Sequence, residues 1–132
     1  MLIEVLPSVR LPRTFRRFSG LMSQLLQKMS IRSSNGSAKL LRLIKGPVTR
    51  HLPANIKRWG FSAHADRRVA PTALAKEMAR DDITVLVFGA MAHGSIDVTY
   101  TDESISVSGY PLSGAAAIAR VLGAAEAEWG VF

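Results

Sequence analysis

Residues 85–94, VLVFGAMAHG, are the stretch that decides how the rest of the chain is interpreted. Val85–Phe88 is an apolar run rich in strand-favouring residues; it ends at Gly89, and Gly94 follows five positions later. This pattern predicts a buried strand that leads into a tight loop. Because α/β proteins bind ligands at the carboxyl ends of their strands, we expect a site here.

The glycine spacing is that of a phosphate-binding loop, G-x-x-x-x-G, but Ser95 and Ile96 stand where that loop needs a lysine and a Ser or Thr. The loop therefore does not hold a nucleoside triphosphate in that way. The residues leave two interpretations open, a plain turn or one wall of a cofactor cleft. A second loop, Gly109-Tyr110-Pro111, also follows a predicted strand and favours the cleft.

The strands and helices expected around these loops indicate an α/β protein with a largely parallel sheet covered on both faces. With 132 residues and 48% hydrophobic content, the chain is predicted to form a single domain, residues 1–132. The predicted strands are Leu2–Val5, Ile56–Ser62, Val85–Phe88, Ile96–Tyr100 and Ser104–Val107. The predicted helices are Thr14 to about Ile31, Ala38–Lys45, Pro71–Arg80 and Ser113–Trp129.

The charge of the chain is strongly positive. Seventeen Lys and Arg against ten Asp and Glu give a formal +7, which favours a polyanionic partner, although a merely solubilising surface has the same composition. Arg10 and Arg13 precede the first predicted helix and Arg17 lies in its first turn. Because the helix dipole opposes cations there, these arginines are predicted to serve binding rather than helix stability.

Other chemistries receive little support from the residues. The chain has no cysteine, which excludes disulfides and thiolate metal sites, and it has no apolar run long enough to span a membrane. His51, His64 and His93 lack metal-ligand spacing, so no metal is expected. The sequence leaves two interpretations of His93 open, an exposed loop residue or a neighbour of a cofactor. Ser108 and Ser113 have no evident His and Asp partners, and the catalytic residue stays unassigned.

Several segments closely resemble the small-subunit ribosomal-RNA pseudouridine N1-methyltransferases of the SPOUT class. They are Leu2–Val5, Pro7–Phe15, Arg17–Met22, Gln24–Leu26, Ile31–Arg32, Gly89–Gly94, Tyr110–Ser113 and Trp129–Val131. The resemblance covers nearly the whole chain and is weakest between Trp59 and Pro71. It implies a SPOUT-type α/β-knot, in which the C-terminal segment forms a trefoil knot that binds S-adenosylmethionine.

The same resemblance implies methylation of N1 of a pseudouridine in small-subunit rRNA, a homodimer and a role in small-subunit assembly, alongside other assembly factors. It implies a nucleolar location, or the cytoplasm for an archaeal source. It also implies that this chain corresponds to the C-terminal portion of the family's chain, with the N-terminal strands of the sheet missing. A non-catalytic rRNA-binding assembly factor and a truncated inactive fragment stay open as alternatives.

Site residues follow from the resemblance by position. The implied cofactor contacts are Phe61, Gly89, Gly94, Val107, Ser108, Gly109, Tyr110, Pro111 and Leu112, and the implied RNA contacts are Arg10, Arg13 and Arg17. Gly109 departs from the asparagine that is usual in the family, which is expected to loosen its loop. The family's aspartate region, proposed to assist deprotonation at N1, has no counterpart here, so the general base is unassigned.

Overall fold

The computed structural model describes residues 1–90 and 99–131. Gly94, His93 and most of the predicted strand Ile96–Tyr100 lie outside the described residues. The chain divides into two compact units, Met1–Leu52 and Pro53–Phe132, and each is considered by itself.

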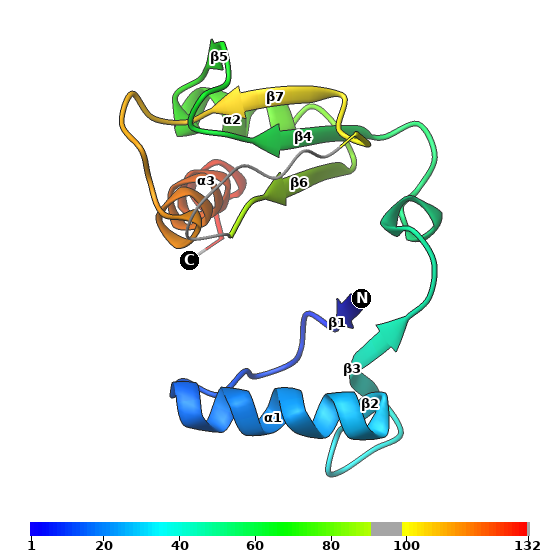
Figure 1. Ribbon diagram of the computed structural model, residues 1–132. Coiled ribbons are helices and arrows are strands. Elements are labelled where there is room, and N and C mark those ends of the chain that lie inside the picture. Colours follow the sequence, from blue (N-terminus) through cyan, green and yellow to red (C-terminus); the bar gives the residue numbers. More distant parts are fainter. Residues whose placement is uncertain (91–98, 132) are drawn as a thin grey trace. The chain divides into compact units, whose positions relative to one another are not determined.

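The first unit is a small antiparallel sheet with one long helix (Figure 1). Its strands pair in the order β1-β3-β2. Its elements are β1 (Leu2–Val5), α1 (Phe15–Lys28), β2 (Ser30–Arg32), β3 (Lys39–Ile44) and the short 3-10 helix η1 (Val48–His51). Leu25 of α1 and Leu41 of β3 are its fully buried side chains among the described residues.

Two expectations for the first unit need correction. The helix begins after Thr14 as predicted, but it ends at Lys28 because Met29 takes a left-handed conformation with φ 61°, and Ile31 already lies in β2. The predicted helix Ala38–Lys45 is wrong, since β3 occupies this segment. A short apolar run suits a helix or a strand equally, and backbone pairing with both β1 and β2 decides for the strand.

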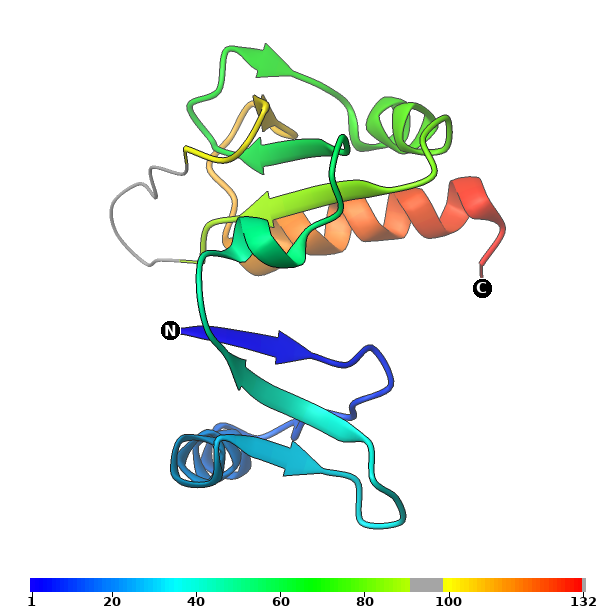
Figure 2. The ribbon, with the colours of Figure 1, turned by 90° about the vertical axis from the view of Figure 1, so that its right-hand side faces the viewer.

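The second unit contains the predicted parallel sheet, which is confirmed. Its strands are β4 (Lys57–Phe61), β5 (Arg67–Arg68), β6 (Thr84–Phe88) and β7 (Glu103–Ser106), and its helices are α2 (Pro71–Met78) and α3 (Gly114–Trp129). The strand order is β5-β7-β4-β6, and every pairing is parallel. In Figure 2 the β4 and β6 arrows run side by side in the same direction.

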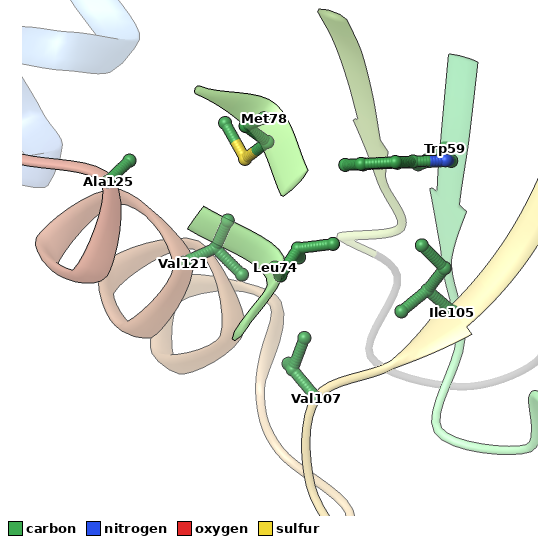
Figure 3. Close-up of a cluster of buried hydrophobic side chains, with 7 residues drawn as sticks. All are labelled: Trp59, Leu74, Met78, Ile105, Val107, Val121 and Ala125. Atoms are coloured by element: carbon green, nitrogen blue, oxygen red, sulfur yellow. The ribbon is translucent and has the colours of Figure 1, made fainter. Parts of the chain in front are cut away.

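One hydrophobic cluster joins this sheet to both of its helices. Its buried members are Trp59, Leu74, Met78, Ile105, Val107, Val121 and Ala125 (Figure 3). Because Trp59 and Ile105 meet residues of α2 and of α3 in the same cluster, both helices pack on one face of the sheet. The expectation that the helices are shared between the two faces is therefore wrong. Burial of each large apolar side chain here contributes about 1.5–3 kcal/mol.

Local sequence signals set the ends of both helices. Pro71 occupies the first turn of α2, where its missing N–H costs nothing. The Oγ of Ser113 accepts a hydrogen bond from the backbone N–H of Ala116 at 3.2 Å, so Ser113 is the N-cap of α3 as predicted. Gly130 closes α3 in a left-handed conformation.

Candidate functional site

A cavity of about 520 Å³ opens at the carboxyl ends of β4, β6 and β7. Its lining comprises Gly60, Phe61, Ser62, Ala63, His64, Val87, Phe88, Gly89, Tyr100, Thr101, Ser104, Ile105, Ser106, Val107, Ser108, Tyr110, Leu112, Gly114 and Ala117. Gly89 and Tyr110 border the same space, so the residue at which the first loop begins and the second loop line one cavity at the sheet end. The structure thus favours the cleft over the plain turn.

The residues nominated for the cofactor fall into three groups. Those that line the cavity are Phe61, Gly89, Val107, Ser108, Tyr110 and Leu112. Gly109 and Pro111 belong to the second loop but are not among the lining residues. Gly94 lies outside the described residues. The structure therefore brings most of the nominated positions to one place.

Gly114 is a site residue that the sequence did not single out. A Cβ added to it would lie 2.7 Å from the carbonyl oxygen of Gly89 and 3.5 Å from Cα of Ala90. Because the obstacle is backbone, only glycine lets the first turn of α3 approach the end of β6 this closely. A glycine directly after the predicted N-cap Ser113 was the available signal.

Two aromatic rings form an apolar part of the lining. Phe61 ends β4 and Phe88 ends β6, and their rings stack with centroids 4.2 Å apart and planes 9° from parallel. Phe61 was nominated from the resemblance, whereas Phe88 was read only as part of a buried strand. The parallel register, which pairs these two positions, brings the rings together.

The second loop is braced by its own serines. The buried Oγ of Ser106 donates to the carbonyl oxygen of Ser108 at 2.9 Å, and the backbone N–H of Tyr110 donates to Oγ of Ser108 at 3.0 Å. These bonds hold the backbone on both sides of Gly109. The loosening expected from glycine at this position is thus countered by hydrogen bonds within the loop.

Charged side chains stay out of the described lining, which contains no Lys, Arg, Asp or Glu. Its ionisable groups are His64, Tyr100 and Tyr110. In the parts of the chain that the structure describes, no three His, Asp or Glu side chains gather as a metal site would require. Nor does any described helix have the length and apolar character needed to cross a membrane.

An ion-pair network fixes the strand at the edge of the sheet. The guanidinium of Arg67 donates to Oε1 of Glu77 at 2.7 Å and to Oε2 of Glu103 at 2.8 Å. The hydrogen bond that Arg67 donates to Glu77 is the main cause of a raised pKa at Arg67, and Glu103 adds to it. Arg67 therefore ties β5 to α2 and β7.

The arginines nominated for RNA lie in the first unit. Arg10, Arg13 and Arg17 are exposed, and none of their side chains makes a hydrogen bond or ion pair with another residue that the structure describes. This unit contains ten Lys and Arg, and Glu4 is its one Asp or Glu in the sequence. Glu4 pairs with Arg42, so the three arginines have no carboxylate of their own unit to compete for them.

Comparison with known proteins gives concordant matches. Residues 1–126 match the family described as EMG1/NEP1 methyltransferase. The chain is 44% identical over 136 residues to the mouse protein "Ribosomal RNA small subunit methyltransferase NEP1", a match that covers 99% of this chain and 52% of that protein. It is 49% identical over 124 residues to the Schizosaccharomyces pombe methyltransferase mra1, covering 92% of this chain and 34% of that protein.

A solved structure shares the fold. The crystal structure of Archaeoglobus fulgidus Nep1 bound to S-adenosylhomocysteine superimposes with a TM-score of 0.76 at 22% identity. That match covers 97% of this chain and 57% of the archaeal chain. The SPOUT-type α/β fold expected from the sequence is confirmed. The chain spans about half the length of most of the curated relatives that it matches, and about a third of mra1.

Proposed function

The chain belongs to the EMG1/NEP1 methyltransferase family, and on that premise we propose that it binds S-adenosylmethionine in the cavity of its second unit. We further propose that the arginines of the first unit bind small-subunit rRNA. The reaction served would be methylation of N1 of a pseudouridine. The names of the curated relatives, which are ribosomal-RNA small-subunit methyltransferases, support the class of substrate.

The observation that carries the cofactor proposal is the cavity itself. Its volume of about 520 Å³ lies within the roughly 300–1,000 Å³ that is usual for small-molecule sites. The stacked rings of Phe61 and Phe88 provide an apolar wall for a purine, and the braced loop around Ser108 offers backbone and hydroxyl groups for a polar tail. The residues present therefore fit S-adenosylmethionine.

When bound, S-adenosylmethionine supplies an electrophilic methyl group. Gly89, Val107, Ser108 and Leu112 would hold it, and Gly114 would keep the first loop against α3. Arg10, Arg13 and Arg17 would hold the RNA by its phosphates, which positions a nucleotide without reading its sequence. Holding two reactants in a fixed orientation is itself a large part of catalysis in a transfer of this kind.

The finer features of the assignment are also proposals. We propose that residues 1–132 act as a single SPOUT methyltransferase domain with a trefoil knot, that the protein works as a homodimer in small-subunit assembly, and that it does so in the nucleolus. The resemblance of the sequence supports these features, and the animal and fungal relatives agree with the location.

Calorimetric titration with S-adenosylmethionine and S-adenosylhomocysteine tests the cofactor proposal. We expect saturable heat with both ligands and none with ATP, because the lysine of a phosphate-binding loop is absent. Leu112→Ala should weaken the affinity roughly tenfold, since Leu112 lines the cavity. The matched variant Leu122→Ala, on an exposed part of α3, should leave the affinity unchanged. Absence of heat and of any thermal shift at millimolar cofactor would sink the proposal.

A second candidate is an rRNA-binding assembly factor without catalysis. The exposed arginines, whose side chains have no partner among the described residues, favour it, because they need nothing from the cavity to bind RNA. RNA binding that persists without detectable cofactor binding would identify this alternative.

A further inference from the structure

The segment Ser62–Arg68 borders the cavity, although it lies where the sequence departs most from the family pattern. Ser62, Ala63 and His64 belong to the lining, and the segment ends in the edge strand β5 (Figure 1). Strand β5 is held in register by β7, where Arg67 pairs with Ile105 and Arg68 pairs with Ser106. The sheet therefore fixes the end of the segment that carries Arg67 and Arg68, whereas Ser62–His64 lie in the turn that precedes it.

The two arginines of β5 have opposite surroundings. Arg67 shares a face with Ile105, on the helix side of the sheet. Its guanidinium forms ion pairs with Glu77 and Glu103. Arg68 shares the other face with Ser106, because paired strand positions point the same way and successive ones alternate. Ser106 and Ile105 both line the cavity, so the register places Arg68 beside the cavity, although Arg68 is not one of its lining residues.

Arg68 lies directly against the second loop. A Cβ added to Gly109 would be 3.4 Å from Nη1 of Arg68 and 3.8 Å from its Cζ. The guanidinium therefore lies beside the backbone of the second loop at Gly109. Arg68 is exposed, and its side chain makes no hydrogen bond or ion pair with another described residue, so its guanidinium donors are available to a ligand.

We propose that Arg68 binds a backbone phosphate of the RNA beside the target nucleotide and so positions that nucleotide at the cavity. The described lining has no Lys or Arg, and the second unit has nine Asp and Glu against seven Lys and Arg. A phosphate that binds beside the cavity therefore needs a nearby cation. Lys57 is paired with Asp81, and Arg67 is paired as described above. A guanidinium suits the role because its donors match phosphate oxygens in pairs.

This inference rests on the proposed function, and three variants of the full chain test it. They are Arg68→Ala, Arg68→Lys and the matched control Arg120→Ala, which removes an exposed arginine from α3. The dissociation constant for a synthetic small-subunit rRNA hairpin with one pseudouridine is measured over a range of salt concentrations. S-adenosylmethionine affinity is measured in parallel by calorimetry.

Arg68→Ala is expected to weaken RNA binding roughly tenfold and to lower the salt-dependence slope by about one unit, with cofactor affinity unchanged. Arg68→Lys should restore the slope but only part of the affinity, and Arg120→Ala should change neither. Unaltered RNA binding in Arg68→Ala would overturn the inference. So would weakened cofactor binding at constant slope, which would assign the guanidinium to the cofactor carboxylate or to support of the loop. Failure of the unmodified chain to bind cofactor would instead count against the proposed function.

Discussion

The two units of this chain differ in charge, in the type of sheet and in the number of buried apolar side chains. In Met1–Leu52, ten Lys and Arg accompany a single carboxylate, the sheet is antiparallel, and two described apolar side chains, Leu25 and Leu41, are buried. In Pro53–Phe132, acids slightly outnumber bases, the sheet is parallel, and eight described apolar side chains are buried.

The proposed function assigns a different task to each unit. In that proposal the arginines of the first unit bind a polyanion, which would relieve their mutual repulsion. A well-packed parallel sheet instead fixes loops at its carboxyl edge, where a cavity needs precise walls. Phe15 illustrates the first case, since it remains 85% exposed although it begins the apolar stripe of α1.

The largest expected effect tests whether the second unit depends on close packing at its cavity. Gly114→Ala would place a methyl group 2.7 Å from the Gly89 carbonyl oxygen, so we expect a loss of about 1–3 kcal/mol in the free energy of unfolding. Gly123→Ala is the matched control in the same helix, where a Cβ meets nothing within 4 Å. It should stabilise by about 0.5–1 kcal/mol. Urea denaturation measures both, and equal effects would refute the close contact.

The next effect tests whether the first unit binds RNA at particular positions or only through its net charge. Arg13→Ala is expected to weaken binding to the rRNA hairpin about fivefold to tenfold and to lower the salt slope by about one unit. Lys28→Ala removes the same charge from the other end of α1 and should change affinity less than about twofold. Equal losses in the two variants would support a diffuse, solubilising charge instead.

The smallest expected effect comes from a comparison of one ion pair in the second unit with one ion pair in the first unit. Glu77→Gln removes the main partner of Arg67, whose side chain is 35% exposed, and should cost about 1 kcal/mol of unfolding free energy. Glu4→Gln breaks the more exposed pair with Arg42 and should cost less than about 0.5 kcal/mol. Both are measured by urea denaturation at low and high salt. A larger loss for Glu4→Gln would contradict this ranking.

Much of the site was open to prediction because its signals are local. The end of the strand at Phe88 and Gly89, the N-cap Ser113 and the second loop after β7 each depend on a few neighbouring residues. Phe88 and Gly114 were missed for the opposite reason. Their importance lies in a stacked ring from another strand and in a carbonyl group 25 residues away in sequence, which no local pattern records.

By itself, the sequence determined the α/β class, the long helices with clear apolar spacing and the separation of charge along the chain, since each is written in composition or in short periods. Tertiary structure alone decided the strand at Lys39–Ile44, the packing of α2 and α3 on one face of the sheet, and which residues line the cavity. These depend on hydrogen bonds and contacts between distant segments, whose pairing no single segment can specify. Residues 85–94, VLVFGAMAHG, illustrate both cases. The strand in this stretch was predictable from the sequence, whereas other residues that line the cavity with Gly89 come from β4, β7 and α3.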